Sequence, residues 1–145
     1  MFTILAGISA VMITQMLIKN REIQEAHRTK KIEIYTSFIT TATSMLSIEN
    51  NDLSIKAPTE KELINILFQF KRDILLYGSP KVVKSQLKFM EIAQKNPNQV
   101  VKAVDNIYKA MREDIGLSNS GLNNYELIKM FVTDPDEIDK VMLSK

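Results

Sequence analysis

The chain opens with an uncharged run and then changes abruptly. Residues 2–18 contain no charged side chain. A membrane-spanning helix needs about 17–25 apolar residues, and 17 helical residues cover roughly 25 Å. The run is therefore short for a bilayer but workable, and we predict a transmembrane anchor over residues 1–18.

A cluster of cations follows the uncharged run. Five lie within thirteen positions: Lys19, Arg21, Arg28, Lys30 and Lys31. These residues are predicted to contact anionic lipid from a basic juxtamembrane helix over residues 19–31. The positive-inside rule then places the N-terminus outside and residues 19–145 in the cytoplasm. The expected location is the inner (cytoplasmic) membrane, in a single pass.

Two other interpretations of the opening segment remain open. The first is a secretion signal, which begins with a positive region and ends at a small-x-small cleavage site. It is disfavoured here, because no lysine or arginine precedes the apolar run and no convincing cleavage site follows it. A helix that is apolar on all sides also occurs in the centre of a bundle or at an oligomer interface. Within the predicted anchor, Ala6 and Ala10 offer a weak small-xxx-small site for helix pairing.

The pattern after the cations predicts that the first helix continues. No proline or glycine occurs between Gly7 and Pro58. Apolar residues recur at steps of three and four from Tyr35 to Leu46, which is typical of a helix with one buried face. One long helix should therefore run toward residue 48 and join the core of the domain.

Start signals for shorter helices recur along the rest of the chain. They are the capping box TEKE at 59–62, and the pairs SP at 79–80, NP at 96–97 and DP at 134–135. Gly78 is expected to stop a helix through a positive φ, Gly116 is expected to close another helix, and Asn123 is expected to cap a short helix. The predicted fold class is all-α: the long N-terminal helix plus about five shorter helices, with a cytoplasmic helical bundle over residues 32–145.

Composition excludes several kinds of chemistry. The chain has 145 residues, 45% of them hydrophobic, and no cysteine, so disulfides and a cysteine nucleophile are absent. The net charge of +2 divides into +3 over residues 19–31 and −1 over residues 32–145. The main domain is therefore not basic, and no nucleic-acid partner is expected.

No reaction is indicated by the motifs. The single histidine, His27, lies among the cations and is interpreted as a surface residue. Phosphate-binding, dinucleotide-binding, zinc-protease and hydrolase signatures are all missing. We expect no enzyme activity, no cofactor and no metal.

The most distinctive polar stretch is AMREDIGLSNSGL, residues 110–122. One interpretation is a loop that presents polar groups to a partner. The candidate residues are Arg112, Asp114, Ser118 and Asn119. The favoured interpretation is structural: Gly116 ends a helix, and Arg112 or Asp114 ties the loop down.

Three segments carry a family resemblance. They are RTKKIEIYTSFI (28–39), LLYGSPKVV (75–83) and AMREDIGLSN (110–119). Their order resembles that of small uncharacterised bacterial proteins with an N-terminal membrane helix and a cytoplasmic all-helical domain. That set has no assigned activity, so the resemblance implies an architecture and no site residue.

These observations favour a non-enzymatic, membrane-anchored helical module that holds an interaction domain at the inner membrane. Its expected partners are membrane lipid and either another protein or further copies of itself. One alternative is an oligomerising, membrane-perturbing effector of a stress or phage-defence module. Another is a soluble helical subunit of a larger assembly in which residues 2–18 are buried.

Overall fold

The computed structural model describes residues 2–47, 59–96, 99–132 and 134–143. Within the first helix, side chains are described from Val11 to Ser44. The described elements are α1 (Phe2–Ser47), α2 (Glu60–Tyr77), α3 (Pro80–Lys95), α4 (Val100–Asp114), α5 (Glu126–Lys129) and α6 (Pro135–Leu143). The described residues contain no strand. The prediction of an all-α chain with a long N-terminal helix and shorter helices is confirmed.

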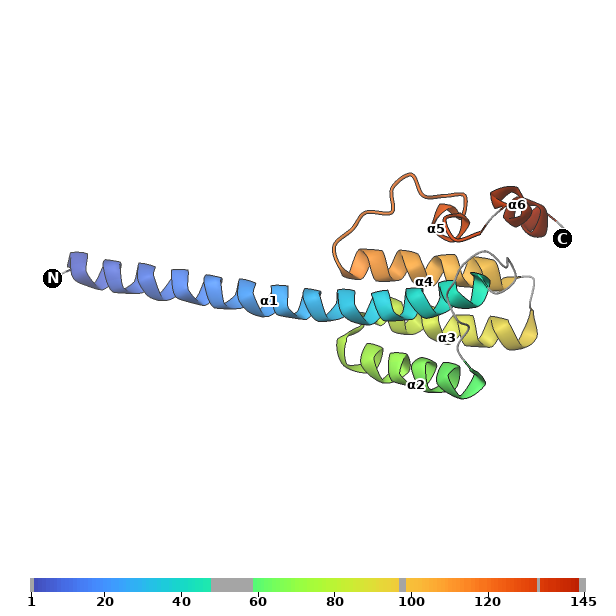
Figure 1. Cartoon of the computed structure of the whole chain (residues 1–145). Coiled ribbons are helices and arrows are strands. Elements are labelled where there is room, and N and C mark those ends of the chain that lie inside the picture. Colours follow the sequence, from blue (N-terminus) through green and yellow to red (C-terminus); the bar gives the residue numbers. More distant parts are fainter. Residues whose placement is uncertain (1, 48–58, 97–98, 133, 144–145) are drawn as a thin grey trace.

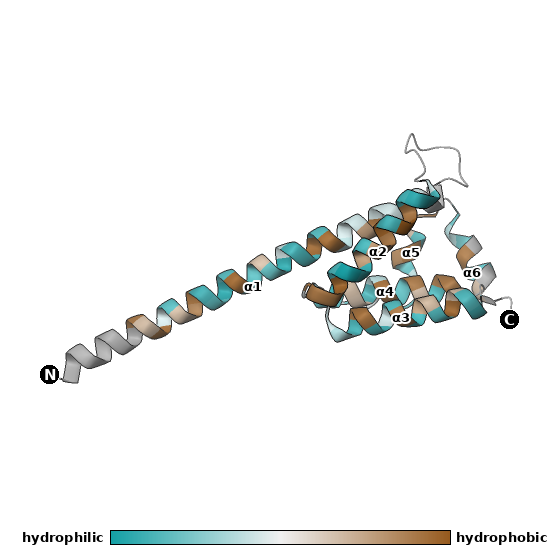
Figure 2. Cartoon of the chain, turned by 90° about the horizontal axis from the view of Figure 1, so that it is seen from below, coloured by the Kyte–Doolittle hydropathy of each residue, from teal (hydrophilic) through white to brown (hydrophobic). Residues whose placement is uncertain are grey.

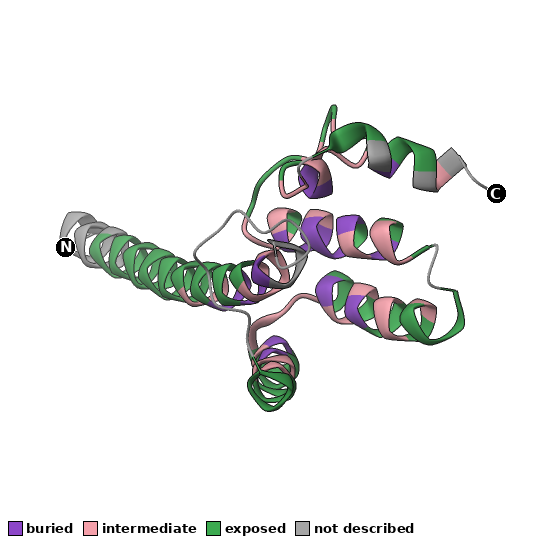
Figure 3. Cartoon of the chain, turned by 45° about the vertical axis from the view of Figure 1, so that its right-hand side comes forward, coloured by how far each residue is buried: buried purple, intermediate pink, exposed green. Residues whose placement is uncertain are grey.

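Helix α1 has two halves with different surroundings. Figure 1 shows its C-terminal half against the other helices and its N-terminal half projecting away from them. The described side chains from Val11 to Thr29 are all exposed, and the first buried side chains are those of Ile34 and Tyr35. Figure 3 shows the same change along the helix. The other helices therefore pack against α1 only from about residue 27 onward.

The core forms where α1 meets α2, α3 and α4. Helices that are neighbours in sequence from α1 to α5 also pack against one another. The buried core residues are Ile34, Tyr35, Phe38, Phe70, Ile74, Val82, Ile107, Tyr108, Ala110, Met111 and Leu127. The rings of Phe38 and Phe70 stack with centroids 4.0 Å apart, which joins α1 to α2.

Several predicted helix boundaries are confirmed. The Thr59 hydroxyl accepts a hydrogen bond from the Glu62 N–H at 3.3 Å, and Glu62 Oε2 accepts one from the Thr59 N–H at 2.8 Å. These two bonds make the capping box at the start of α2. Ser79 caps α3, with Pro80 at its first turn, and α6 begins at Pro135.

Three details of the boundary predictions are wrong. Gly78 closes α2 with φ −73°, so it does not act through a positive φ. It is needed because a Cβ there would lie 2.7 Å from the Ile74 carbonyl oxygen. Asn96 is the residue that ends α3, whereas α4 begins at Val100 after Gln99.

The third correction concerns the short helix after residue 122. Asn123 does not cap it, because α5 begins at Glu126 and the residue before it is Tyr125, with φ 60°. The Asn124 N–H instead donates to Glu126 Oε2 at 2.8 Å. Local polar signals thus located the element but not its first residue.

Among the described residues, no helix combines the length and the apolar character that crossing a membrane requires. Residue 1 and the side chains of residues 2–10 lie outside the described part of the chain. The predicted anchor over residues 1–18 is thus described as helix from Phe2, but its side chains are described only from Val11 onward. The proposed pairing residues Ala6 and Ala10 fall outside the described side chains.

Two phenylalanines on α2 provide a matched test of the core. Phe70 is 3% exposed and Phe68 is 70% exposed. Phe70→Ala should reduce the free energy of unfolding by about 3–5 kcal/mol, because it removes the stack with Phe38 and leaves a cavity. Phe68→Ala should change it by about 0.5 kcal/mol or less. Urea unfolding followed by circular dichroism measures both, and equal losses would contradict this core.

Candidate functional site

The carboxylate of Asp114 joins three segments at the end of α4. Its Oδ1 accepts a hydrogen bond from Lys31 Nζ of α1 at 2.8 Å. Its Oδ2 accepts from the Tyr35 hydroxyl of α1 and from the Ser79 N–H of the α2–α3 turn at 3.1 Å. The Asp114 side chain is 6% exposed. We call Asp114, Lys31, Tyr35 and Ser79 the helix junction.

Helix spacing explains why α1 supplies two of these groups. Lys31, Tyr35 and Phe38 lie at positions i, i+4 and i+7, so they share one face of α1. Phe38 anchors that face in the core. The same face therefore directs Lys31 and Tyr35 toward the end of α4.

The end of α4 is shaped to present Asp114. The Leu117 N–H donates to the Arg112 carbonyl at 2.8 Å, and the Gly116 N–H donates to the Glu113 carbonyl at 3.0 Å. Together they form a Schellman motif, which requires the positive φ of +87° at Gly116. The predicted role of Gly116 as a helix stop is confirmed.

The charges at this helix end are complementary. An acidic residue in the last turn of a helix is unfavourable, because the C-terminal end of the macrodipole is already negative. Lys31 neutralises Asp114, and Arg28 Nε donates to the Ile115 carbonyl oxygen at 3.1 Å. Two cations of α1 thus bind the negative end of α4.

The junction changes the pKa of both acidic groups in it. Burial alone would raise the pKa of Asp114, but hydrogen bonds from Lys31, Tyr35 and Ser79 and the charge of Lys31 outweigh it. The net effect holds the pKa of Asp114 below its usual value. Burial, the hydrogen bond to Asp114 and the charge of Asp114 all raise the pKa of the Tyr35 phenol. At neutral pH the pair is therefore a carboxylate accepting from a neutral phenol.

The polar loop after α4 is folded back onto the helix. Arg112 donates to Asn119 Oδ1 at 3.1 Å and to the Ser118 carbonyl oxygen at 3.0 Å. The Asn119 amide donates to the Lys109 carbonyl oxygen and to Glu113, each at 2.9 Å. Arg112 and Asn119 are thus engaged in holding the loop, as the structural interpretation expects. Ser118 is exposed.

The five predicted lipid-contact cations occupy different places. Lys19 and Arg21 are exposed on the projecting half of α1. Lys30 pairs with Glu33 at 2.9 Å. Arg28 lies near Glu25 and binds Ile115, while Lys31, 20% exposed, pairs with Asp114. Only Lys19 and Arg21 precede the part of α1 that the bundle holds.

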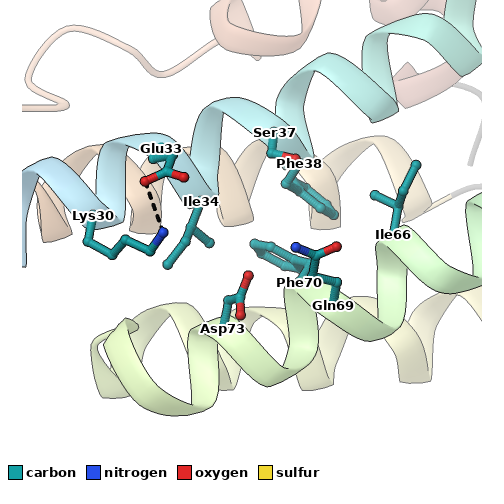
Figure 4. Close-up of a pocket in the computed structure, with 9 residues that line it drawn as sticks. All are labelled: Lys30, Glu33, Ile34, Ser37, Phe38, Ile66, Gln69, Phe70 and Asp73. Atoms are coloured by element: carbon teal, nitrogen blue, oxygen red, sulfur yellow. Dashed lines mark hydrogen bonds and ion pairs between the residues drawn. The ribbon is translucent and has the colours of Figure 1, made fainter.

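A cleft of about 110 Å³ lies between α1 and α2. Figure 4 shows Lys30, Glu33 and Asp73 on one side and the facing rings of Phe38 and Phe70 on the other. The Lys30 ammonium donates a hydrogen bond to Glu33, and the stacked rings of Phe38 and Phe70 line the cleft. In the described part of the chain, no three histidine, aspartate or glutamate side chains are placed to hold a metal ion.

Sequence reasoning identified Asp114 and Lys31 separately but missed their pairing. It assigned Lys31 to lipid and Asp114 to a loop. The available signal was the face of α1, since Lys31 extends the buried positions Tyr35 and Phe38 by one turn. No local pattern showed which residue of α4 would meet that face.

Comparison of the chain with protein-family models, curated proteins and solved structures finds no match. The resemblance to small bacterial membrane proteins therefore gains no support from a matched relative, and the function must be argued from the described residues.

The junction should make folding depend on pH. A carboxyl whose pKa is lowered in the folded state adds stability above its unfolded pKa of about 4, and this stability is lost as the pH falls through the folded pKa. Asp114→Asn should reduce the free energy of unfolding at pH 7 by about 1–3 kcal/mol, because it leaves the Lys31 ammonium partly buried without its carboxylate. It should also flatten the decline of stability below pH 4.

The matched control is Asp136→Asn, which removes an exposed carboxylate of α6. It should leave stability at pH 7 nearly unchanged. Urea titrations at a series of pH values compare the two variants. An Asp114→Asn protein with wild-type stability and the same pH profile would show that the junction contributes little.

Proposed function

We propose that this chain is a non-enzymatic module in which α1 anchors a helical interaction domain at the inner membrane. The observation that carries the proposal is the projecting half of α1. Its apolar side chains are exposed and lie outside the bundle. Such a segment needs surroundings other than water, because exposed apolar area is unfavourable there.

The distribution of these side chains favours lipid over a partner helix. Six are more than half exposed: Val11, Met12, Ile13, Met16, Leu17 and Ile18. At 3.6 residues per turn they point in all directions around the helix axis. A partner helix needs one apolar stripe, whereas hydrocarbon surrounds a helix completely.

Helix physics supports the same environment. An isolated helix in water is only marginally stable unless an apolar face is packed. Within hydrocarbon a helix satisfies its own backbone hydrogen bonds, and the transfer of its apolar side chains out of water is favourable. The projecting half, which has no other helix beside it in Figure 1, gains most from such surroundings.

The polar segment that follows fits the boundary of a membrane. Figure 2 shows hydrophobic residues in the first coloured turns of α1 and mainly hydrophilic residues between them and the bundle. Lys19 and Arg21 lie at this change. Their side chains can reach the headgroups of the cytoplasmic leaflet, which supports an external N-terminus and a cytoplasmic domain.

A pair of substitutions tests the anchor. Met12→Lys places a charge in the apolar run and should weaken insertion by about 2.5–3.5 kcal/mol. Ile64→Lys is the control, because Ile64 is 59% exposed on α2, away from the run. After alkaline carbonate extraction, the wild type and Ile64→Lys should remain with the membranes, and Met12→Lys should be released in part.

The opposite result would indicate that residues 2–18 are covered by protein and not by lipid. A wild-type chain that is released by carbonate, and purifies without detergent in a defined complex, would contradict the anchor. It would support the alternative in which residues 2–18 are buried in an assembly.

A further inference from the structure

The end of the bundle beside the projecting half of α1 carries an exposed group of leucines. Leu75 and Leu76 lie in the last turn of α2 and are 77% and 69% exposed. Leu117 follows α4 and is 40% exposed. We call these three residues the leucine end.

Two contacts place the leucine end where α1 leaves the bundle. The rings of His27 and Tyr77 lie 6.0 Å apart, and Arg28 binds the Ile115 carbonyl oxygen at 3.1 Å. In Figure 1 the end of α2 and the loop after α4 lie on the side from which α1 projects. The leucine end therefore lies on the side of the bundle from which α1 projects.

We infer that the leucine end rests on the cytoplasmic lipid surface, with Leu75, Leu76 and Leu117 in the interfacial layer. The inference builds on the proposed anchor and adds a second membrane contact, made by the domain itself. The surface that the leucine end contacts is anionic lipid.

The length of α1 places the leucine end at the right depth. With the side chains of Lys19 and Arg21 reaching up to the headgroups, the helix leaves the hydrocarbon by about residue 21. Six residues then lead to His27, a rise of about 9 Å. The headgroup layer of one leaflet is about 5–8 Å thick, so the backbone of the leucine end lies at the cytoplasmic edge of this layer.

The charge around the leucine end suits an anionic surface. The acids Glu25, Asp73 and Glu113 each lie within ion-pair distance of a cation, respectively Arg28, Arg72 and Lys81. Lys71 and Lys84 are exposed and have no acidic partner among the described ion pairs, while one exposed acid of α1, Glu22, has no cationic partner among them. The surplus is positive, and each such cation is attracted to anionic lipid.

The composition of the chain permits a direct test, because it contains no tryptophan. Leu76→Trp therefore carries a single tryptophan at the leucine end. Phe68→Trp is the matched control, since Phe68 is 70% exposed on the same helix but lies eight residues, about 12 Å, farther from that end. Leu17→Trp reports on the anchor itself.

Each full-length variant is reconstituted into vesicles that contain phosphatidylglycerol and brominated lipid, which quenches nearby tryptophan. Leu17→Trp should be strongly quenched by lipid brominated in the upper acyl chain, because Leu17 lies about 6 Å inside a boundary at residue 21. Leu76→Trp should shift to shorter wavelength and lose roughly half its emission to lipid brominated near the headgroup, as expected of an interfacial side chain. Phe68→Trp should be quenched little.

The outcomes separate the inference from the anchor. Quenching of Leu17→Trp, with Leu76→Trp quenched no more than Phe68→Trp, would overturn the inference and leave the anchor standing. A blue shift of both α2 variants without quenching would mean that a protein or a second copy covers α2, which also overturns it. An unquenched Leu17→Trp would overturn the anchor and the inference together.

Discussion

The fold depends on how the bundle holds α1, and the carboxylate of Asp114 is central to that attachment. One side chain accepts hydrogen bonds from α1 and from the α2–α3 turn while ending α4. The apolar contact of Phe38 with Phe70 supplies burial beside it, but burial is non-directional. Directional, charge-assisted bonds at Asp114 are what fix the position of α1 along and around its own axis.

This attachment fixes the direction in which the projecting half of α1 extends. The described side chains from Val11 to Ala26 are exposed outside the bundle, so the direction of the projecting half follows from the turns at Arg28 to Tyr35. A domain fixed in this way to a membrane helix would be held at a set height and orientation above the lipid. The exposed leucines at the same end would then add a second contact, which would limit tilting of the domain.

The sequence predicted the parts of the fold that depend on local chemistry. The capping box at Thr59, the Ser79-Pro80 start and the Gly116 stop each act within one helical turn, and each is present. It also predicted that Tyr35 and Phe38 lie on the buried face of α1, because helix periodicity is local, whereas Met45 and Leu46 of the same predicted face fall outside the described side chains. It did not predict the pairing of Lys31 with Asp114, since 83 residues separate them. From the sequence alone, a lysine that pairs with a distant carboxylate cannot be told from a lysine that contacts lipid headgroups. The reason for Gly78 was missed similarly, because the close approach to Ile74 is set by the path of the turn.

The most direct test measures whether α1 and the bundle move as one body. Because the chain has no cysteine, Gln24→Cys and Leu87→Cys give one spin label on the projecting half of α1 and one on α3. In vesicles of anionic lipid, pulsed dipolar spectroscopy should give a single narrow distribution of distances between the labels. A broad or multiple distribution would show that α1 pivots at the junction, and would contradict the claim that Asp114 builds the helix into the domain.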